Sequence, residues 1–586
     1  MSQTKRLDKY WDIVIAALAT LALIIVVGTV FDYYYEFNDD VLMKDILAGV
    51  YTGTPEALNI QMQAPVSAII ALFYRIVPSL PWYGYFLCFM HYGCLFLLIH
   101  RAVSLLQRKR SKVMLAVIAD VLFAVIALPH LVMAQYTITV AIMAATASFL
   151  FYTIPEDLTK RQFIEQSVMP VIILFVAYLV RSEMLLLMLP YVAITGLVRW
   201  NKEKKMFSSE NIFKYLVVAA AIVIGIGIGF VGNKVGYSSA EWKEFYRLFD
   251  NRTELYDYQY IPDYEENKDF YDGIELKRSQ YNLLVNYDYA IDEAIDADML
   301  GLVAEYAAGL RDDSILARIP GAVKMYLYRV IHFSDGLYSA LTAILYVFVA
   351  IAIFARKDST VFYKIKIFVL RVGGLIVIRS IPWMYIILGR RAPDRIVHSL
   401  YIIEIIILCG FLIVEGVSRL RNREFIMMIA SVILFVGAVV TIPLVARSLK
   451  LHIETQDRIN IYAQEIDEYC SKHPENFYFE DVYTTIRDGE SFNQKMFENV
   501  DNSLSNYDLI GGWAANSPLF FDKLSNFGIK DVRMDLIEKD NVYLINDMEY
   551  PTDWIVELYA DYGLDVVVEQ TDTIARIFGV YQIRKQ

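Results

Sequence analysis

Two adjacent carboxylates, Asp39 and Asp40, follow the first hydrophobic segment and are the strongest candidates for chemistry in this chain. Residues 31–37, which lead to them, interleave acids with aromatic rings of the kind that settle where a membrane meets water. A carboxylate held at that level could take a proton from a substrate hydroxyl group. The alternative interpretation is a solvated acidic loop within an aromatic belt.

A second polar group lies late in the chain and consists of three arginines and three further polar residues on the next helix: Arg390, Arg391, Arg395, His398, Tyr401 and Glu404. Guanidinium groups bind phosphate oxygens in a bidentate manner, so the arginines predict a site for a lipid phosphate. The three-residue spacing of the other side chains places them roughly on one helix face. Alternatively, the arginines pair with acidic parts of the protein or with lipid head groups.

A third group, residues 250–257, mixes charges with aromatic rings and contains Arg252 and Asp257. Such a run is usually a solvated face. Here it could fold over the site that Asp39 and Asp40 would form, so both residues are candidates for substrate binding.

The elements that must position these residues are membrane helices. The chain has 586 residues, of which 56% are hydrophobic and 14% aromatic. Its apolar stretches recur at about 18 to 20 residues, the length that crosses a hydrocarbon layer of about 30 Å. Three of the four cysteines lie in apolar segments, so no disulfide framework or cysteine metal site is expected.

The distribution of basic residues predicts the topology, because basic loops stay in the cytoplasm. About eleven spanning elements result, and they correspond to Ile13–Val30, Trp82–Ile99, Val113–Pro129, Leu131–Phe151, a hairpin over Val168–Val198 that is broken around residues 181–183 and Pro190, Phe213–Val231, Leu337–Phe354, Ile367–Leu388, Ile396–Val414 and Phe425–Val445. The N-terminus is then cytoplasmic, and the shorter run Ala64–Val77 is juxtamembrane or re-entrant. Asp39 and Asp40 lie outside the cell.

Charge supports this division. Residues 233–320 carry 9 basic and 19 acidic residues, and residues 450–586 carry 12 and 26, so the rest of the chain is net +12. An acidic exterior and a basic cytoplasmic face suit a multi-pass plasma-membrane protein that binds no nucleic acid. The predicted organisation is an N-terminal transmembrane bundle (1–232) with a catalytic first exterior loop (32–63), a large acidic exterior loop (233–332), C-terminal transmembrane helices (333–449) with a basic exterior loop (389–395), and an extracytoplasmic α/β domain (450–586).

The α/β prediction rests on alternating short strands and helices. Strands are expected near 476–480, 507–510 and 542–545, with a final pair at 564–568 and 574–583. Helices are expected near 455–470, 517–526 and 551–563. Gly227, Gly229 and Gly232 match a dinucleotide-binding pattern, but they lie in an apolar stretch without a preceding strand, so the match is discarded. Gly225 and Gly229 indicate close helix packing instead.

The layout of these features resembles the GT-C type of integral-membrane glycosyltransferases, in the branch with protein O-mannosyltransferases and bacterial cell-envelope sugar transferases. Those proteins carry an acidic pair after the first helix, short juxtamembrane helices, broken middle helices and a basic exterior loop. Here the matching features are Asp39-Asp40, Ala64–Val77, the break at 181–183 and the arginines of 389–395. The resemblance implies a GT-C-like bundle, a polyprenyl-phosphate sugar donor and an inverting transfer.

The expected activity is therefore sugar transfer to a cell-envelope glycan, lipid or protein acceptor on the exterior face of the lipid bilayer. Asp39 or Asp40 would be the general base, and Arg390, Arg391 and Arg395 would stabilise the leaving phosphate. No cofactor is expected; a divalent metal is compatible with this chemistry but is not indicated by a ligand set. Two alternatives use similar residues: a transporter of envelope lipids or polysaccharides, and an O-antigen-type polymerase or ligase.

Overall fold

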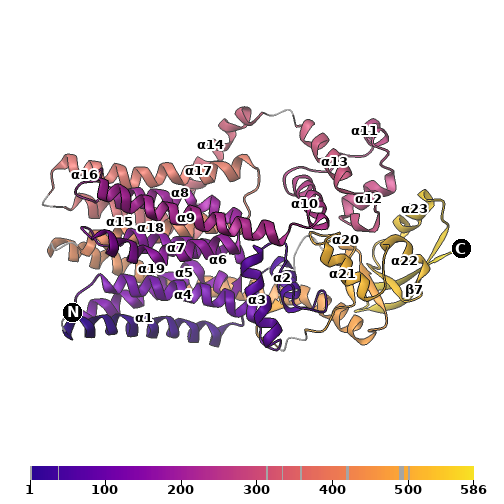
Figure 1. The fold of residues 1–586 in the computed structure, drawn as a ribbon, viewed down its shortest axis with the longest axis horizontal. Coiled ribbons are helices and arrows are strands. Elements are labelled where there is room, and N and C mark those ends of the chain that lie inside the picture. The colour runs from indigo at the N-terminus through magenta and orange to yellow at the C-terminus, as the bar shows by residue number, and fades with distance from the viewer. Residues whose placement is uncertain are drawn as a thin grey trace.

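The structure, a computed structural model of the 586-residue chain, describes residues 3–36, 38–311, 314–332, 334–356, 359–417, 421–486, 494–498 and 502–586. Phe37, in the aromatic approach to Asp39, and the basic residues Lys357 and Arg419 lie outside the described residues. The protein is 71% helical, with a long bundle on one side and smaller units gathered at one end of it (Figure 1). We call this end of the bundle the polar end.

The bundle is formed by α1 (Gln3–Val30), α4 (Trp82–Ser104), α5 (Lys109–Val132), α6 (Tyr136–Tyr152), α7 (Lys160–Val180), α8 (Ser182–Trp200), α9 (Ser209–Gly236), α15 (Gly336–Phe354), α16 (Val361–Phe368), η3 (Val369–Gly373), α17 (Gly374–Leu388), α18 (Asp394–Val417) and α19 (Arg421–Lys472). Within the described ranges, nine helices are long and apolar enough to cross a membrane. The prediction of a polytopic helical membrane protein is confirmed.

Each predicted spanning element coincides with helical structure. Two fall short of the length or continuity that the other nine have: α6 has 17 residues, and the π-helical turn η3 divides the segment that contains α17. The predicted break at residues 181–183 is confirmed, because Arg181 adopts an extended backbone between α7 and α8. The predicted break at Pro190 is wrong, because α8 continues through this proline to Trp200. The number of about eleven spanning elements stays a prediction.

Helix α6 lies at the centre of the bundle because its sequence is apolar all round. Every residue from Tyr136 to Phe149 is buried, and the helix packs against α4, α7, α8 and α18. Glycine brings α9 against α7: a Cβ atom on Gly229 would lie 2.9 Å from the Tyr178 ring. The predicted packing role of this glycine is confirmed.

The polar end carries the first loop and both large polar regions (Figure 1). After α1 come β1 (Tyr34–Tyr35), α2 (Asn38–Ala48) and α3 (Ala64–Ile76). Strand β1 pairs in parallel with β2 (Met133–Ala134), which directly follows α5, and antiparallel with β4 (Gln494–Lys495). This small sheet fixes the loop that leads to Asp39 against the bundle.

A helical unit, residues 237–311, follows α9. It contains α10 (Ala240–Thr253), η1 (Glu254–Tyr258), α11 (Lys268–Gly273), α12 (Arg278–Asn286), η2 (Tyr289–Ile291) and α13 (Ala297–Gly309), and α14 (Ile315–His332) then leads back to the bundle. Ser239 caps α10, since its side chain accepts from the Trp242 amide. We call residues 237–311 the loop unit.

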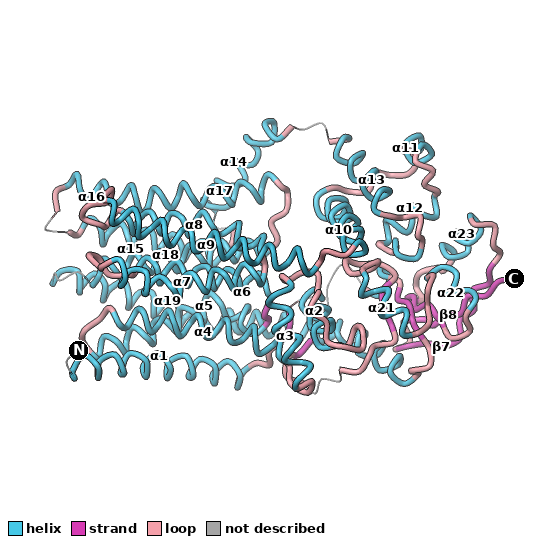
Figure 2. Tube along the Cα trace, in the orientation of Figure 1, coloured by secondary structure: helices cyan, strands magenta, loops and turns pink. Residues whose placement is uncertain are grey.

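The chain ends in an α/β domain, residues 473–586, that holds most of the strands (Figure 2). Its sheet has the order β5 (Tyr507–Leu509), β3 (Phe477–Glu480), β6 (Val542–Asp547), β8 (Phe578–Lys585) and β7 (Val566–Ile574). The helices are α20 (Val482–Thr485), α21 (Pro518–Asn526), α22 (Val532–Glu538) and α23 (Asp553–Asp561).

The predicted strands are confirmed, whereas α20 and α22 were not predicted. The predicted boundary at residue 450 falls inside helix α19, and the division of the chain there stays a prediction. Helix α19 runs without a break to Lys472, because no glycine or proline interrupts residues 444–472. The predicted helix 455–470 is therefore the end of the last bundle helix.

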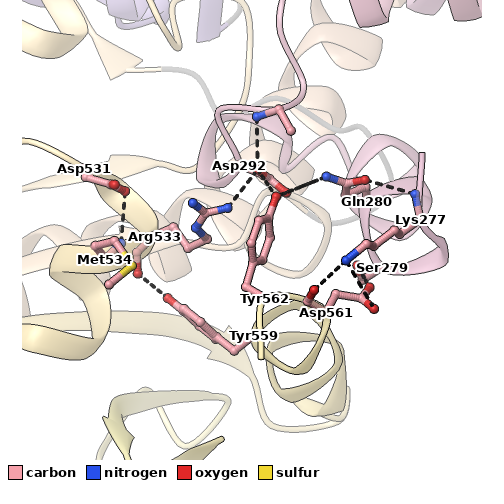
Figure 3. Close-up of polar contacts among 11 residues, drawn as sticks. Lys277, Ser279, Gln280, Asp292, Asp531, Arg533, Met534, Tyr559, Asp561 and Tyr562 are labelled. Atoms are coloured by element: carbon pink, nitrogen blue, oxygen red, sulfur yellow. Dashed lines mark hydrogen bonds and ion pairs between the residues drawn. The ribbon is translucent and has the colours of Figure 1, made fainter. Parts of the chain in front are cut away.

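The loop unit and the α/β domain are joined through buried polar contacts (Figure 3). The buried carboxylate of Asp292 accepts from Gln280 at 3.0 Å, from Arg533 at 3.2 Å and from Tyr562 at 2.8 Å. Asp288 accepts from the Val482 amide at 2.8 Å. These contacts make the two units one assembly at the polar end.

Candidate functional site

The acidic pair begins α2 at the polar end of the bundle. Carboxylates in a first helical turn are favoured by the helix dipole. Asp40 is fully buried and accepts from the Tyr83 hydroxyl at 2.7 Å and from the Tyr136 amide at 3.2 Å. Its second oxygen, Oδ2, has no hydrogen-bond partner among the described residues. Burial raises the pKa of Asp40 to about 7, and the negative charge of Asp39 contributes to the same shift.

Asp39 differs from Asp40 in exposure. Its side chain is partly exposed, and in the part of the chain that the structure describes it makes no hydrogen bond or ion pair. Arg181 is an electrostatic neighbour of both carboxylates, stacks over the Tyr136 ring at 4.6 Å and donates to Thr137. A reachable carboxylate thus lies beside a buried, hydrogen-bonded one.

The third predicted group reaches this region from the loop unit. The Arg252 guanidinium donates to the hydroxyl of Tyr287. Burial raises the pKa of Tyr287, and the negative charges of Asp257 and Asp39 raise it further. Arg391 of the basic loop forms an ion pair with Asp257. The fold therefore gathers residues from three distant stretches of the chain around the start of α2.

A cavity of about 670 Å³ lies between the polar ends of α5, α15 and α18 and the middle of α19. Its apolar lining includes Val125, Leu337, Val445 and Leu449. Its charged and histidine side chains are Glu36, His130, Asp335, Asp394, Arg395, His398 and His452. The cavity is amphipathic and large enough for the head group and the first part of the chain of a lipid.

Glu36 connects the cavity with the acidic pair. Burial raises the pKa of Glu36 to about 8, and the charge of Asp40 contributes, whereas Arg395 opposes the shift. The site thus places one arginine and several carboxyl groups in a poorly hydrated space, where charges interact strongly.

Two hydrogen-bonded groups shape the cavity wall. His130 and His398 approach at 3.1 Å, and the ring of Tyr338 stacks on His398 at 4.4 Å. Tyr401 donates to Asp335 at 2.8 Å. Both predicted residues, His398 and Tyr401, therefore lie on the α18 face that contacts α15 or its N-cap residue Asp335.

The three arginines of the basic loop do not converge. Arg395 lines the cavity, Arg391 pairs with Asp257, and Arg390 is exposed at a positive φ of 57°. For Arg391 this geometry matches the alternative expectation of pairing with an acidic unit. Arg395 alone of the three lies where a cavity-bound phosphate could meet it.

Several side chains at the site were not predicted: Glu36, Tyr83, His130, Tyr136 and Asp335. Glu36 stands in the acid-aromatic run before Asp39, which was noted without a role. Tyr83 and Tyr136 carry no signal in the sequence, because tyrosines are numerous near membrane surfaces. His130 follows a proline at the end of an apolar stretch, a place where a polar residue must face water or a partner.

The described residues hold no group of three or more His, Cys, Asp or Glu side chains placed to bind a metal ion. The expectation that no cofactor is needed stays a prediction. The fold and the site together define a polytopic helical membrane protein with an acidic pair and an amphipathic cavity at one end. No family model, curated protein or solved structure matches this chain.

Proposed function

We propose that this protein transfers a sugar from a polyprenyl-phosphate donor to a hydroxyl-bearing acceptor of the cell envelope. The observation that carries the proposal is the pairing of a reachable carboxylate, Asp39, with a buried one, Asp40, beside a cavity lined by Arg395. This combination supplies a base and a cation for the leaving group. These are the two requirements of an inverting transfer.

In this mechanism the acceptor hydroxyl oxygen attacks the anomeric carbon from the face opposite the phosphate. The bond between the anomeric carbon and the phosphate oxygen breaks, and the electron pair leaves with the lipid phosphate. Asp39 takes the acceptor proton. Arg395 stabilises the negative charge that grows on the phosphate, and no further co-reactant is required.

Asp39 is the better base because an acceptor can reach it. Asp40 is buried and already accepts from Tyr83 and from the Tyr136 amide. We assign Asp40 a positioning role, in which it fixes the first turn of α2 and thereby the direction of Asp39. Arg181 lies near both carboxylates and favours the ionised form of Asp40.

The cavity supports a lipid-linked donor. Val125, Val445 and Leu449 give it an apolar side suited to the first isoprene units, and Arg395 belongs to its polar side. Under this proposal the chain is a multi-pass plasma-membrane protein with a GT-C-like bundle. Its N-terminus is cytoplasmic, and the loop unit and α/β domain lie outside, where the acceptor is found.

A second candidate, transport of an envelope lipid or polysaccharide, is favoured by one observation inside the bundle. Arg379 and Glu404 are both buried and form an ion pair at 3.3 Å, and Tyr346 donates to the same Glu404 oxygen at 2.6 Å. Ionisable side chains at this depth often mark a transport path.

One experiment separates the two functions. Purified protein in liposomes is given a panel of radiolabelled polyprenyl-phosphate sugars and a mixture of envelope acceptors. A transferase releases free lipid phosphate and labels an acceptor. Movement of intact donor across the bilayer, without release of lipid phosphate, would support the transporter and refute the transferase.

A further inference from the structure

The α/β domain reaches back into the bundle beside the acidic pair. Residues 494–498, which we call the β4 segment, leave that domain and pair with β1. Tyr34 lies opposite Lys495, Tyr35 lies opposite Gln494, and the Met496 amide donates to the carbonyl oxygen of Tyr33 at 2.8 Å. The segment therefore completes the small sheet that holds the loop before Asp39.

Met496 is the centre of this contact. Its side chain is fully buried, although it comes from a loop of the α/β domain. It packs on Gly84 of α4, where an added Cβ atom would lie 3.3 Å from the Met496 Cβ and 3.0 Å from the Tyr35 hydroxyl oxygen. A larger residue at 84 would push both neighbours away. The buried packing position of Met496 thus depends on a glycine in the bundle.

A path through Gly84 and two tyrosine rings connects Met496 with Asp40. Met496 and Tyr35 pack on the same side of Gly84. The Tyr35 ring stacks on the Tyr83 ring, with centroids 5.6 Å apart and planes within 12°. The Tyr83 hydroxyl then donates to Asp40 at 2.7 Å. A displacement of Met496 would therefore reach Asp40 through rigid aromatic rings.

The α/β domain also holds the chain after α2. The Ser505 amide donates to the Val50 carbonyl at 3.0 Å, and the Asn526 side chain donates to the Thr52 carbonyl at 3.2 Å. Lys523 lies 4.4 Å above the ring of Tyr51. The stretch that contains α2 is thus held by the α/β domain on both sides of the helix.

We propose that the β4 segment positions the acidic pair, with Met496 and Gly84 as positioning residues. The α/β domain then acts as a scaffold that sets the direction of Asp39 and Asp40. This inference rests on the proposed function only for its effect on turnover, because the positioning itself can be measured without substrate. It gives the α/β domain a role in the reaction without a catalytic group of its own.

The first test is structural. The Tyr136 amide donates to Asp40, so its hydrogen exchange reports whether Asp40 is in place. We expect exchange at Tyr136 and along α2 to quicken at least about tenfold in Met496→Asp, since a buried charge cannot stay in that packing position. Met496→Leu should exchange like the wild type. Val567→Asp, an exposed position in the same domain, is the matched control.

A disulfide crosslink tests whether holding the β4 segment against β1 restores slow exchange in Met496→Asp. Tyr34 and Lys495 are directly opposite in antiparallel pairing, where Cα atoms are about 4.5 to 5.5 Å apart, a separation that a disulfide can bridge in the pair Tyr34→Cys with Lys495→Cys. Added to Met496→Asp, the oxidised pair should restore slow exchange at Tyr136, and reduction should abolish the rescue. Unchanged exchange in Met496→Asp, or a formed crosslink without rescue, would overturn the proposal.

The second test uses turnover. A misplacement of about 1 Å can cost about a hundredfold in rate. We expect Met496→Asp to lower kcat by about ten- to a hundredfold with less than about a threefold change in donor KM, because Arg395 lies outside the β4 contact. A rise in donor KM of about ten- to a hundredfold with an unchanged kcat would contradict positioning. If no variant transfers sugar but exchange responds as expected, the proposed function fails while the scaffold role stands.

Discussion

The hydrogen bond from Tyr83 to Asp40 offers a quantitative test of the site. Tyr83→Phe removes the donor and leaves the ring that stacks on Tyr35. A hydrogen bond to a charged group contributes about 1.5 to 3 kcal/mol. Since about 1.4 kcal/mol corresponds to one pKa unit, the loss should raise the pKa of Asp40 from about 7 to between about 8 and 9. The direction is upward because the bond favours the ionised carboxylate.

The assay is a pH titration of the protonated carboxyl band in infrared difference spectra, with Asp40→Asn used to assign the band. Tyr92→Phe is the matched control, because Tyr92 lies on the same helix and bonds to Tyr33 at 2.8 Å. The control should leave the titration unchanged. A pKa of Asp40 that stays or falls in Tyr83→Phe would refute the geometry on which the assignment of Asp40 rests.

Three further results are expected. Arg395→Ala should weaken donor binding by about 1.5 to 3 kcal/mol, measured with a labelled lipid phosphate, and Arg391→Ala should leave binding nearly unchanged. In the wild type, the free energy of unfolding should fall as pH rises above about 4, because burial and a neighbouring carboxyl raise the pKa of Asp288 on folding and the folded state therefore binds the proton more tightly. Asp288→Asn should abolish this fall. This is measured by denaturant unfolding at several pH values, and an identical slope in wild type and variant would contradict it. In intact cells, Glu569→Cys should react with an impermeant thiol reagent and Lys109→Cys should not; the opposite pattern would reverse the proposed orientation.

The native cysteine in the last bundle helix cannot serve for that labelling. Cys470 is fully buried, so it would stay unlabelled on either side of the membrane. The thiol is buried because the end of α19 packs on the sheet of the α/β domain, near Tyr478 and Ile545.

The bundle could be predicted because the length and apolar content of a membrane helix are local properties. The same holds for the strands of the α/β domain, which alternate over short runs between turn residues. The continuous α19 could not be predicted, because the change from apolar to polar composition near residue 450 looks like a domain boundary. A helix can pass through such a change without interruption.

The candidate site was predictable where a residue type is unusual for its place, as for Asp39 and Asp40 or for Arg395 on the side opposite to most basic loops. The partners of these residues were not. Tyr83 bonds to Asp40 across 43 positions in the chain, and Met496 reaches the same region from the α/β domain. Such contacts are set by tertiary packing, which leaves no local pattern in a single sequence.

The most direct test of the central claim is sugar transfer by Asp39→Asn, purified and shown to be folded by its unfolding transition. The substitution keeps shape and hydrogen bonding and removes the proton acceptor. Release of lipid phosphate from the polyprenyl-phosphate sugar that serves the wild type should fall by about a hundred- to ten-thousandfold, with donor binding retained. Turnover near that of the wild type would show that Asp39 is not the base and would contradict the proposed mechanism.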